Sequence, residues 1–286
     1  MNIRPEHGST DSEMEQARSA FIDALREQVN TPLTLMLGTL RESLTDDRLP
    51  SEERYRVALA HRAALRLLNL VDCLDDLSRI ELGLTRASEE VVDLCQVVTD
   101  VVSPYEDVVK LAGLRLTVDG DESGAVVWCD RDLLERALLH LVSNAFKHTR
   151  QGEILVRVAR VGEAAEVSVL DTGIGIPEQE LPRVFERFYR VRGAWARTGE
   201  ASGLGLALVK AVAESHGGAV RVESRPGIGS SFTISLPVAP AGARVPSPGR
   251  LADRADDVVP GHHPLQEMLA CPGGGHPVHR VPVRVG

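Results

Sequence analysis

Four short motifs in a fixed order decide the fold of this chain. They read Asn144-Ala-Phe-Lys-His148, Asp171-Thr-Gly-Ile-Gly-Ile-Pro177, Gly203-Leu-Gly-Leu206 and Gly227-Ile-Gly-Ser230. Together they supply an amide, a carboxylate and three turns built on paired glycines. Glycine lets the backbone adopt unusual conformations and come close to a ligand. One glycine pair is common in α/β proteins, but the ordered series indicates a nucleotide pocket assembled from separate loops.

The composition excludes several classes of function. The formal net charge is −9, so the chain lacks a basic field for nucleic acid or an anionic membrane. No apolar run approaches the roughly 20 residues that a membrane-spanning helix needs, and the polar N-terminus does not resemble a signal peptide. The four cysteines form no CxxC motif. These features predict a reduced, cytoplasmic protein without membrane insertion.

Two long helices are predicted over residues 13–44 and 51–82, after a disordered stretch at residues 1–12. Their apolar residues recur every three or four positions, which is typical of helices in a left-handed bundle. The short polar connector between them predicts an antiparallel hairpin. One hairpin has little core of its own, so we expect two hairpins to form a dimeric four-helix bundle. The apolar stripe includes Val29 and Met36 in the first helix and Val57, Ala60, Ala64, Leu67, Val71 and Leu74 in the second.

An α+β domain is predicted over residues 91–237, after a linker at residues 83–90. Helices on one face of a mixed sheet would make it a two-layer α/β sandwich. The expected helices are 94–112, 131–149 and 204–216, and the expected strands are 114–119, 125–129, 154–161, 166–171, 219–223 and 231–236.

The last part of the chain, residues 238–286, is rich in Pro, Gly, Arg and His and has no apolar periodicity. Such a composition predicts a disordered tail. Its potential metal ligands are His262, His263, Cys271, His276 and His279. Their spacings match no standard zinc pattern, so we expect an unfolded tail rather than a metal site.

Each polar group of the motifs has a chemical use in a nucleotide pocket. The Asn144 amide oxygen suits Mg²⁺ that already carries triphosphate oxygens, although a structural bond to the backbone is the alternative. Lys147 would reach phosphate as a point charge. Asp171 would accept a hydrogen bond from an exocyclic amine such as that of adenine, or it would form an Asx turn. Gly203 and Gly205 open a helix whose unpaired N–H groups bind phosphate.

Two further segments complete the predicted pocket. The last glycine pair, Gly227 and Gly229, is expected to close a hairpin turn beneath it rather than touch ligand. The polar stretch between Phe188 and Ser202 lacks periodicity and is interpreted as a flexible lid, with Arg190 and Arg192 available for phosphate.

The arrangement resembles the Bergerat-type ATP-binding domain of sensor histidine kinases, in the GHKL superfamily. Residues 140–148, 171–177, 185–190 and 203–206 are similar to its N, G1, F and G2 boxes, and Thr31-Pro-Leu-Thr34 resembles the hairpin of the family. The likeness covers residues 14–237 and implies ATP and Mg²⁺ as cofactors, with Asn144 holding Mg²⁺ through ATP. It implies a binding site made of Asn144, Lys147, His148, Asp171, Gly173, Gly175, Ile176, Tyr189, Arg190, Ser202, Gly203, Leu204, Gly205 and Leu206.

The chain departs from the family pattern at the reacting centre. The family carries its phosphorylated histidine five residues before the proline, followed by an acidic residue. Glu27 and Gln28 stand there. A glutamate can in principle form an acyl phosphate, but both the imidazole nucleophile and its proton acceptor are missing. We therefore do not expect self-phosphorylation on this hairpin. A milder departure is His140, where most sensor kinases carry Asn, and this histidine could still orient water or phosphate.

His61 is the only histidine of the second helix and the one candidate for a substitute acceptor on the hairpin. Counting outward from the connector places Glu27 opposite residue 68, which leaves His61 about 10 Å away along the helix. A structural histidine is therefore expected at this position.

Three functions compete. The first is a histidine-kinase-type ATPase that transfers a phosphoryl group to a histidine on another protein, such as a partner kinase. The second is a catalytically silent dimeric pseudokinase, an ATP-binding regulatory module. Either would form a homodimer or heterodimer through the hairpin and act with a response regulator, and neither would bind nucleic acid. A purely structural dimer leaves the pocket motifs unexplained.

Overall fold

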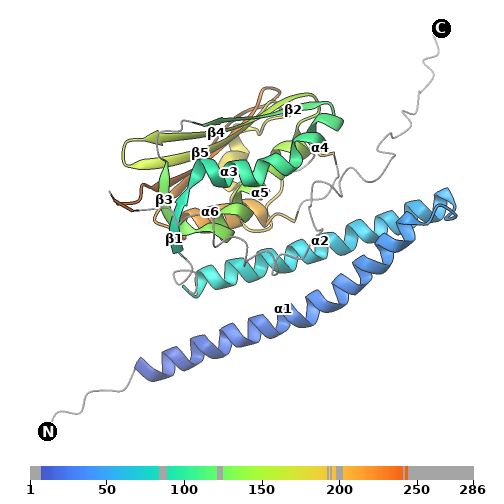
Figure 1. The fold of residues 1–286 in the computed structure, drawn as a ribbon, viewed down its shortest axis with the longest axis horizontal. Helices are drawn as coiled ribbons and strands as arrows, with labels where there is room; N and C mark the ends of the chain where they lie inside the picture. Colours follow the sequence, from blue (N-terminus) through green and yellow to red (C-terminus); the bar gives the residue numbers. More distant parts are fainter. Residues whose placement is uncertain are drawn as a thin grey trace.

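The computed structural model describes residues 8–83, 89–120, 125–191, 193, 195–197, 202–240 and 242–243. The chain begins with a helical hairpin whose two long helices lie beneath a compact α/β part (Figure 1). These helices are α1 (Gly8–Thr45) and α2 (Ser51–Glu81). Residues 8–12, expected to be disordered, are the first turn of α1.

The two helices of the hairpin pair with a different offset from the one expected. The Arg26 guanidinium lies 3.1 Å from the Asp75 carboxylate, and Asn30 donates to Asp72 at 3.4 Å. Glu27 is therefore level with the residues just before Asp75 rather than with residue 68. Counting outward from the connector assumes that the two helices leave it at the same level, and these contacts show that one is shifted along the other. His61 lies about 20 Å along α2 from the level of Glu27, twice the expected separation.

Few of the apolar hairpin side chains that the structure describes are buried within this single chain. Leu33, Leu37 and Ala64 form a small cluster between the two helices. Most of the predicted stripe faces outward instead: Met36 is 53% exposed and Leu67 is 52% exposed. The hairpin thus carries an apolar face that its own chain leaves uncovered.

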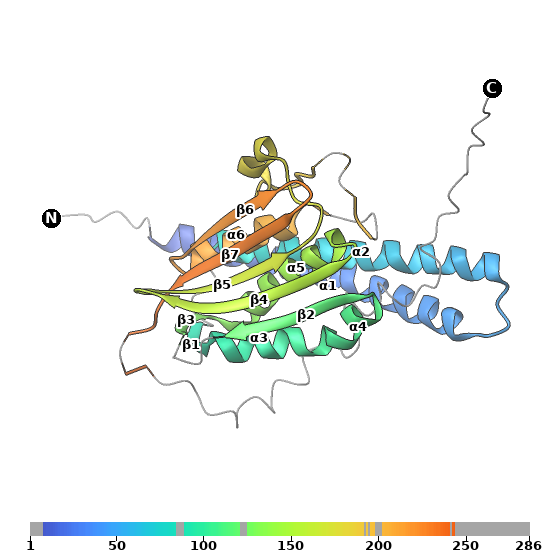
Figure 2. The same cartoon turned by 90° about the horizontal axis from the view of Figure 1, so that it is seen from above.

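The α/β part consists of one main sheet, a small second sheet and a layer of helices. Its elements are β1 (Glu89–Asp93), α3 (Leu94–Val102), η2 (Ser103–Tyr105), α4 (Glu106–Leu111), β2 (Leu114–Gly120), β3 (Val126–Asp130), α5 (Arg131–His148), β4 (Gly152–Val161), β5 (Ala164–Asp171), η3 (Glu178–Arg183), α6 (Gly205–Ser215), β6 (Ala219–Arg225) and β7 (Gly229–Pro237). The main sheet has the order β2-β4-β5-β7-β6, with β2 and β4 parallel and the other pairs antiparallel. This mixed sheet with helices on one face confirms the expected sandwich (Figures 1 and 2).

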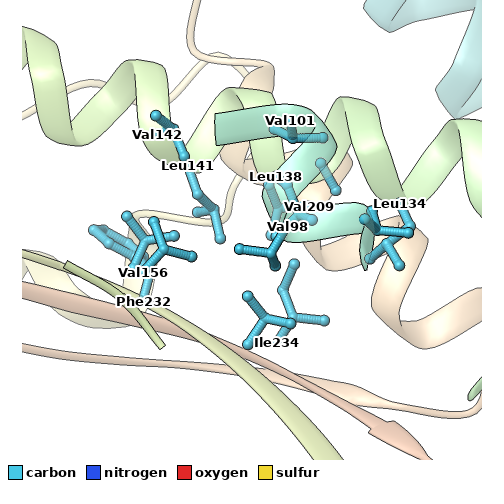
Figure 3. Packing of buried hydrophobic residues seen from close by; sticks show 14 of the residues in the cluster. Val98, Val101, Leu134, Leu138, Leu141, Val142, Val156, Val209, Phe232 and Ile234 are labelled. Atoms are coloured by element: carbon cyan, nitrogen blue, oxygen red, sulfur yellow. The ribbon is translucent and has the colours of Figure 1, made fainter. Parts of the chain in front are cut away.

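The core lies between the main sheet and the helices α3, α5 and α6 (Figure 3). In β4 the buried residues Ile154, Val156 and Val158 alternate with more exposed ones, because successive side chains of a strand point to opposite faces. Leu134, Leu138 and Leu141 supply the facing side of α5. The opposite face of the sheet carries mostly polar residues, such as the paired Arg157 and Ser168.

Several elements differ from the sequence-based expectation. The helix predicted over residues 94–112 is divided near Pro104 into α3, η2 and α4, since proline lacks the N–H that a helix interior needs. The expected linker includes Glu89 and Glu90, which belong to β1; residues 84–88 lie outside the described residues. The strand at 125–129 pairs with β1 and not with the main sheet.

The chain continues to pair after β7. Val238 forms an antiparallel bridge with Val127, and the Ala239 N–H donates to the Val126 carbonyl at 2.8 Å. The first residues of the predicted tail therefore belong to the fold. Residues 244–286, with the tail histidines and Cys271, lie outside the described residues.

The C-terminal end of α2 packs directly against the α/β part. Cys73 and Leu77, each 3% exposed, belong to the same buried cluster as the helices beneath the sheet. Arg136 of α5 pairs with the buried Asp76, and Arg187 pairs with Glu81 near the end of α2. Hairpin and α/β part therefore share one hydrophobic core.

Candidate nucleotide-binding site

The first part of the candidate site is the C-terminal half of α5. Asp130 caps this helix, since its carboxylate accepts from the Leu133 N–H at 3.1 Å. Leu138, Leu141 and their neighbours bury one face against the sheet, and Asn144 is half-buried beside them. Within the described residues, the Asn144 side chain has no hydrogen-bond partner that would satisfy it structurally. Its amide oxygen is thus available to a ligand.

The loop after β5 lies against the end of α5. The Ile174 N–H donates to the His148 carbonyl at 3.2 Å, and Gly173 packs on the same carbonyl group. A side chain at position 173 would collide there, which explains the small residue. Asp171, the last residue of β5, is held beside this contact. The first two motifs are therefore in contact, although 23 residues separate Asp171 from His148.

Asp171 occupies an environment that favours its neutral form. Burial raises the pKa of its carboxyl to about 6, although hydrogen bonds from the backbone of Gly173 and Ser230 act in the opposite direction. The Gly173 N–H donates to Oδ1 at 2.7 Å. The Asx-type bond from the Gly173 N–H is thus present, and the hydrogen bond from Asp171 to adenine stays a prediction.

The hairpin between β6 and β7 supports the loop after β5 from below. The Gly227 N–H donates to the Ile174 carbonyl and the Ile176 N–H to the Ser224 hydroxyl, both at 2.8 Å. Gly175 has a φ of +66°, and the Arg225 carbonyl lies where its Cβ would be. A residue with a side chain would be strained there and would clash. The last glycine motif thus closes the turn between β6 and β7, as the sequence predicted, and this turn contacts the loop after β5.

The N-terminus of α6 is the third part of the site. Ser202 accepts from the Leu204 N–H at 3.2 Å, and α6 begins at Gly205. Gly203, with a φ of +74°, packs on the backbone of Phe188, whose N–H donates to the Gly203 carbonyl at 2.8 Å. Leu204 is fully buried and anchors this turn, whereas Leu206 is half-buried. The first N–H groups of α6 are left for an anion.

His140 joins α5 to both neighbouring helices. Its Nε2 lies 3.3 Å from the Cys73 sulfur of α2. On its other side, a Cβ at Gly205 would approach its Nδ1 to 2.9 Å. Burial, followed by the charges of Lys147 and Arg136, lowers the pKa of His140 to about 4. The imidazole is therefore neutral near pH 7.

A contact that the sequence did not predict holds the segment before α6 to the end of α5. The Arg197 side chain donates to the carbonyls of Thr149 (2.9 Å) and Arg150 (2.6 Å), and its backbone N–H donates to the Lys147 carbonyl (2.9 Å). His148 Nδ1 lies 2.8 Å from the Trp195 carbonyl. Cations near a helix C-terminus interact favourably with its exposed carbonyls, and this rule is the only sequence signal that pointed to Arg197.

The two predicted residues of the F-box segment lie apart from these contacts. Tyr189 donates through its hydroxyl to Glu180 of η3, and the Arg183 guanidinium stacks over its ring at 4.2 Å. Arg190 is exposed, and Arg192 lies outside the described residues. The structure therefore places His140 against Gly205 and His148 against the loop that follows Asp171, with Asn144 between them on α5. The side chain of Tyr189 contacts η3 instead.

The phosphoacceptor position of the family is on the surface of α1. Glu27 and Gln28 are both exposed, and His61 of α2 is buried. In the part of the chain that the structure describes, no group of three His, Cys, Asp or Glu side chains could hold a metal ion. None of the described helices is long and apolar enough to cross a membrane.

Comparison with known protein families agrees with this division of the chain. Residues 17–83 match the His Kinase A (phospho-acceptor) domain. Residues 129–240 match the histidine kinase-, DNA gyrase B- and HSP90-like ATPase family.

Similar curated proteins are histidine kinases. The circadian input-output histidine kinase CikA of Synechococcus elongatus is 34% identical over 77% of this chain and 30% of its own length. The sensor-like histidine kinases SenX3 of Mycolicibacterium smegmatis and Mycobacterium tuberculosis are 34% and 36% identical over 87% and 81% of this chain and 63% and 57% of their own lengths. The chain thus spans less than two thirds of these relatives.

Two solved structures have a similar fold. Full-length ShkA in complex with AMPPNP has a TM-score of 0.62 and 27% identity, and covers 77% of this chain and 46% of that one. The histidine kinase AdeS of Acinetobacter baumannii has a TM-score of 0.53 and 26% identity, and covers 74% and 97% of the two chains. With its phosphoacceptor-type hairpin followed by an ATPase-type sandwich, this chain belongs to the sensor histidine kinases.

Proposed function

We propose that this chain binds Mg-ATP between α5, the loop after β5 and the N-terminus of α6, and that it acts in two-component signal transduction. The observation that carries the proposal is the meeting of these three elements around the C-terminal half of α5. The complex of the similar ShkA with AMPPNP supports an adenosine triphosphate as the ligand.

Each group of the pocket has a role in this proposal. Asp171 accepts a hydrogen bond from the exocyclic amine of adenine, and Lys147 and the N–H groups at Gly205 and Leu206 bind phosphate oxygens. The Asn144 amide oxygen holds Mg²⁺, which fits because the described residues offer it no other partner. Mg²⁺ supplies positive charge that neutralises the phosphate oxygens during transfer.

The acceptor of the phosphoryl group lies on another protein in this proposal. Position 27 of α1 is accessible but carries a carboxylate instead of an imidazole, and Gln28 cannot accept the proton. A histidine of a partner kinase would attack the γ-phosphorus through a ring nitrogen, and the bond from that phosphorus to the leaving ADP would break. A response regulator would then be the next partner.

The second candidate function is a catalytically silent pseudokinase. The loss of both residues at the acceptor position favours it, because a chain that never transfers phosphate needs neither. ATP would then act only by changing the relative stability of hairpin arrangements, which requires that it bind one of them more tightly.

A dimer through the hairpin belongs to both candidates. The exposed residues Val29, Met36, Leu67 and Leu74 lie on the stripe that a four-helix bundle would bury. We also propose a cytoplasmic location, which fits the absence of disulfides at Cys73, Cys95 and Cys129 among the described residues.

Incubation with γ-labelled ATP separates the two candidates. We expect the native chain to bind ATP and to show no acid-labile label. The double variant Glu27→His/Gln28→Glu restores the acceptor of the family. Its self-labelling would support an active kinase domain, whereas ATP binding without label would support the pseudokinase. Clear acid-labile label on the native hairpin would contradict both.

Two controls make the labelling experiment specific. Hydroxylamine treatment detects an acyl phosphate on Glu27, because the sensitivity of an acyl phosphate to hydroxylamine differs from that of phosphohistidine. Asp171→Asn in the double variant should weaken ATP binding by about tenfold or more and reduce labelling accordingly. Unchanged binding in this variant would show that the nucleotide pocket is assigned to the wrong residues.

Sedimentation tests the dimer. Met36→Glu and Leu67→Glu together should convert a dimer to a monomer, because they place charges inside the bundle. Leu111→Glu is the matched control, since Leu111 is 82% exposed but lies on α4 of the other part. If Leu111→Glu dissociates the dimer as much as the double variant does, the hairpin is excluded as the interface.

A further inference from the structure

The contact between Cys73 and His140 joins the hairpin to the nucleotide pocket. Cys73 is a residue of α2 and is 3% exposed, while His140 is on α5, one turn before Asn144. The distance of 3.3 Å from sulfur to Nε2 is that of a hydrogen bond. Through this contact a side chain of the hairpin reaches a side chain next to the predicted site.

The other ring nitrogen of His140 faces the start of α6. Nδ1 lies beside Gly205, the first residue of α6, where a Cβ would approach it to 2.9 Å. The ring is therefore held between α2 on one side and the phosphate-binding end of α6 on the other. With the described part of the chain, Nδ1 itself makes no hydrogen bond.

The protonation states of the pair decide which nitrogen carries the hydrogen. Burial raises the pKa of the Cys73 thiol to about 12 and lowers the pKa of His140 to about 4. Near pH 7 the thiol keeps its proton and the imidazole is neutral, with one N–H. A thiol sulfur is a weak acceptor, whereas an unprotonated imidazole nitrogen accepts readily. The S–H therefore donates to Nε2, and the ring N–H is left on Nδ1.

This tautomer suits an anion at the start of α6. With the hydrogen on Nδ1, the ring adds a donor to the unpaired N–H groups of the helix. The opposite tautomer would present a lone pair to the phosphate oxygens and repel them. Which nitrogen carries the hydrogen is set by the bond that the other nitrogen makes.

We propose that Cys73 is a positioning residue: it orients His140 and fixes its tautomer, so that Nδ1–H donates to a phosphate group of the nucleotide. The proposal rests on the nucleotide site proposed above. Phosphate binding then depends on the docking of α2. By linkage, a bound triphosphate favours the docked hairpin by the same factor by which docking raises the affinity for the triphosphate. The hairpin thus takes part in the nucleotide site through one of its own side chains.

The affinities of ATP and adenosine, measured by calorimetry, test the proposal. Cys73→Ala should weaken ATP binding by about three- to tenfold, the worth of one hydrogen bond, and leave adenosine binding unchanged. Cys73→Ser keeps a donor and should restore most of the ATP affinity. Cys129→Ala is the matched control, because Cys129 is a fully buried thiol of the same core. It should not change the ratio of the two affinities.

A double-mutant cycle shows whether Cys73 acts through His140. In a His140→Gln background, Cys73→Ala should have no further effect on ATP affinity, because the residue that it positions is gone. An effect of undiminished size would overturn the proposal. So would an equal loss of ATP and adenosine affinity in Cys73→Ala, which would indicate a general disturbance of the fold.

The native protein provides a readout that needs no variant at Cys73. Nitrogen NMR of the histidine rings, with His140 assigned by its absence in His140→Gln, should find the Nδ1–H tautomer near pH 7. The Nε2–H tautomer would overturn the proposal. Native protein that binds neither ATP nor adenosine would contradict the proposed function itself. If the native protein binds both ligands but Cys73→Ala leaves the ratio of ATP to adenosine affinity unchanged, only the positioning role is contradicted.

Discussion

Burial changes the titration of Asp171, the carboxyl group that we propose to bind adenine. The strand β5 places it at the edge of the core, where desolvation raises its pKa to about 6. The ionised form, which accepts hydrogen bonds best, is then the minor form below that pH. Because the folded pKa is raised, ligand binding through this carboxylate weakens as the pH falls through about 6, rather than only below about 4.

We therefore predict that adenosine binds more weakly at low pH. Between about pH 7.5 and about pH 5.5 its affinity should fall by about fourfold, as the carboxyl becomes protonated. Adenosine is the suitable ligand for calorimetry because it lacks phosphates that titrate in the same range. In Asp171→Asn the affinity should be lower by about tenfold or more and independent of pH in this window. A pH dependence that survives this substitution would assign it to another group.

At the level of elements, the end of α5 is the point where the segments of the proposed pocket are held together. The Arg197 side chain satisfies carbonyls that a helix C-terminus leaves without partners, and its guanidinium lies 5.3 Å from the centre of the Phe146 ring. The Arg150 guanidinium covers the ring of Trp195 at 4.3 Å. These contacts fix the segment around residues 195–197 to the helix that carries Asn144 and Lys147.

Arg197→Ala should release this segment. The loss of two charge-assisted hydrogen bonds, which are partly exposed, predicts a decrease of about 1–2 kcal/mol in unfolding free energy in urea. Trp195 should become more accessible to a quencher, which fluorescence measures in a Trp128→Phe background because the chain has only two tryptophans. Arg197→Lys keeps the charge but not the two parallel N–H donors of the guanidinium. Its unfolding free energy and its quenching should lie between those of the native chain and those of Arg197→Ala. Unchanged quenching in Arg197→Ala would contradict this role.

The sequence predicted the elements that have a clear period or a glycine signature. The alternation in β4 and β5, the apolar face of α5 and the turn at Gly227 are local patterns, and the structure contains all of them. The sequence did not predict β1, because this strand begins with the charged residues Glu89 and Glu90. Their strand partners are the distant Asp130 and Cys129. Nor did the sequence predict the bond from Cys73 to His140, since 67 residues separate them and their meeting depends on how α2 docks.

At the scale of the whole molecule, the hairpin and the sandwich form one packed body. Leu77 of α2 is 3% exposed within the core that includes α5 and α6, whereas Leu33 belongs to a separate cluster inside the hairpin. A substitution at Leu77 therefore acts on both parts, and one at Leu33 acts on the hairpin.

Leu77→Ala should reduce the unfolding free energy by about 2–4 kcal/mol, because it leaves a cavity between α2 and the sandwich. Both tryptophans lie in the sandwich, so their fluorescence reports its unfolding. We expect Leu77→Ala to lower the urea midpoint of the fluorescence transition. Leu33→Ala, the matched control, should lower helical circular dichroism at a given urea concentration without moving that midpoint. Equal midpoint shifts in the two variants would indicate a single core without a separate hairpin cluster.

The pairing of Val238 and Ala239 with β3 has a consequence for the solution behaviour of the protein. These residues cover the edge of β3 opposite to β1, and the Val238 N–H also donates to the Glu163 carbonyl at 2.9 Å. An uncovered strand edge offers its N–H and C=O groups to other chains. A chain that stops at Pro237 should therefore self-associate with rising concentration in light scattering, whereas a chain that stops after Pro240 keeps its edge covered and should not.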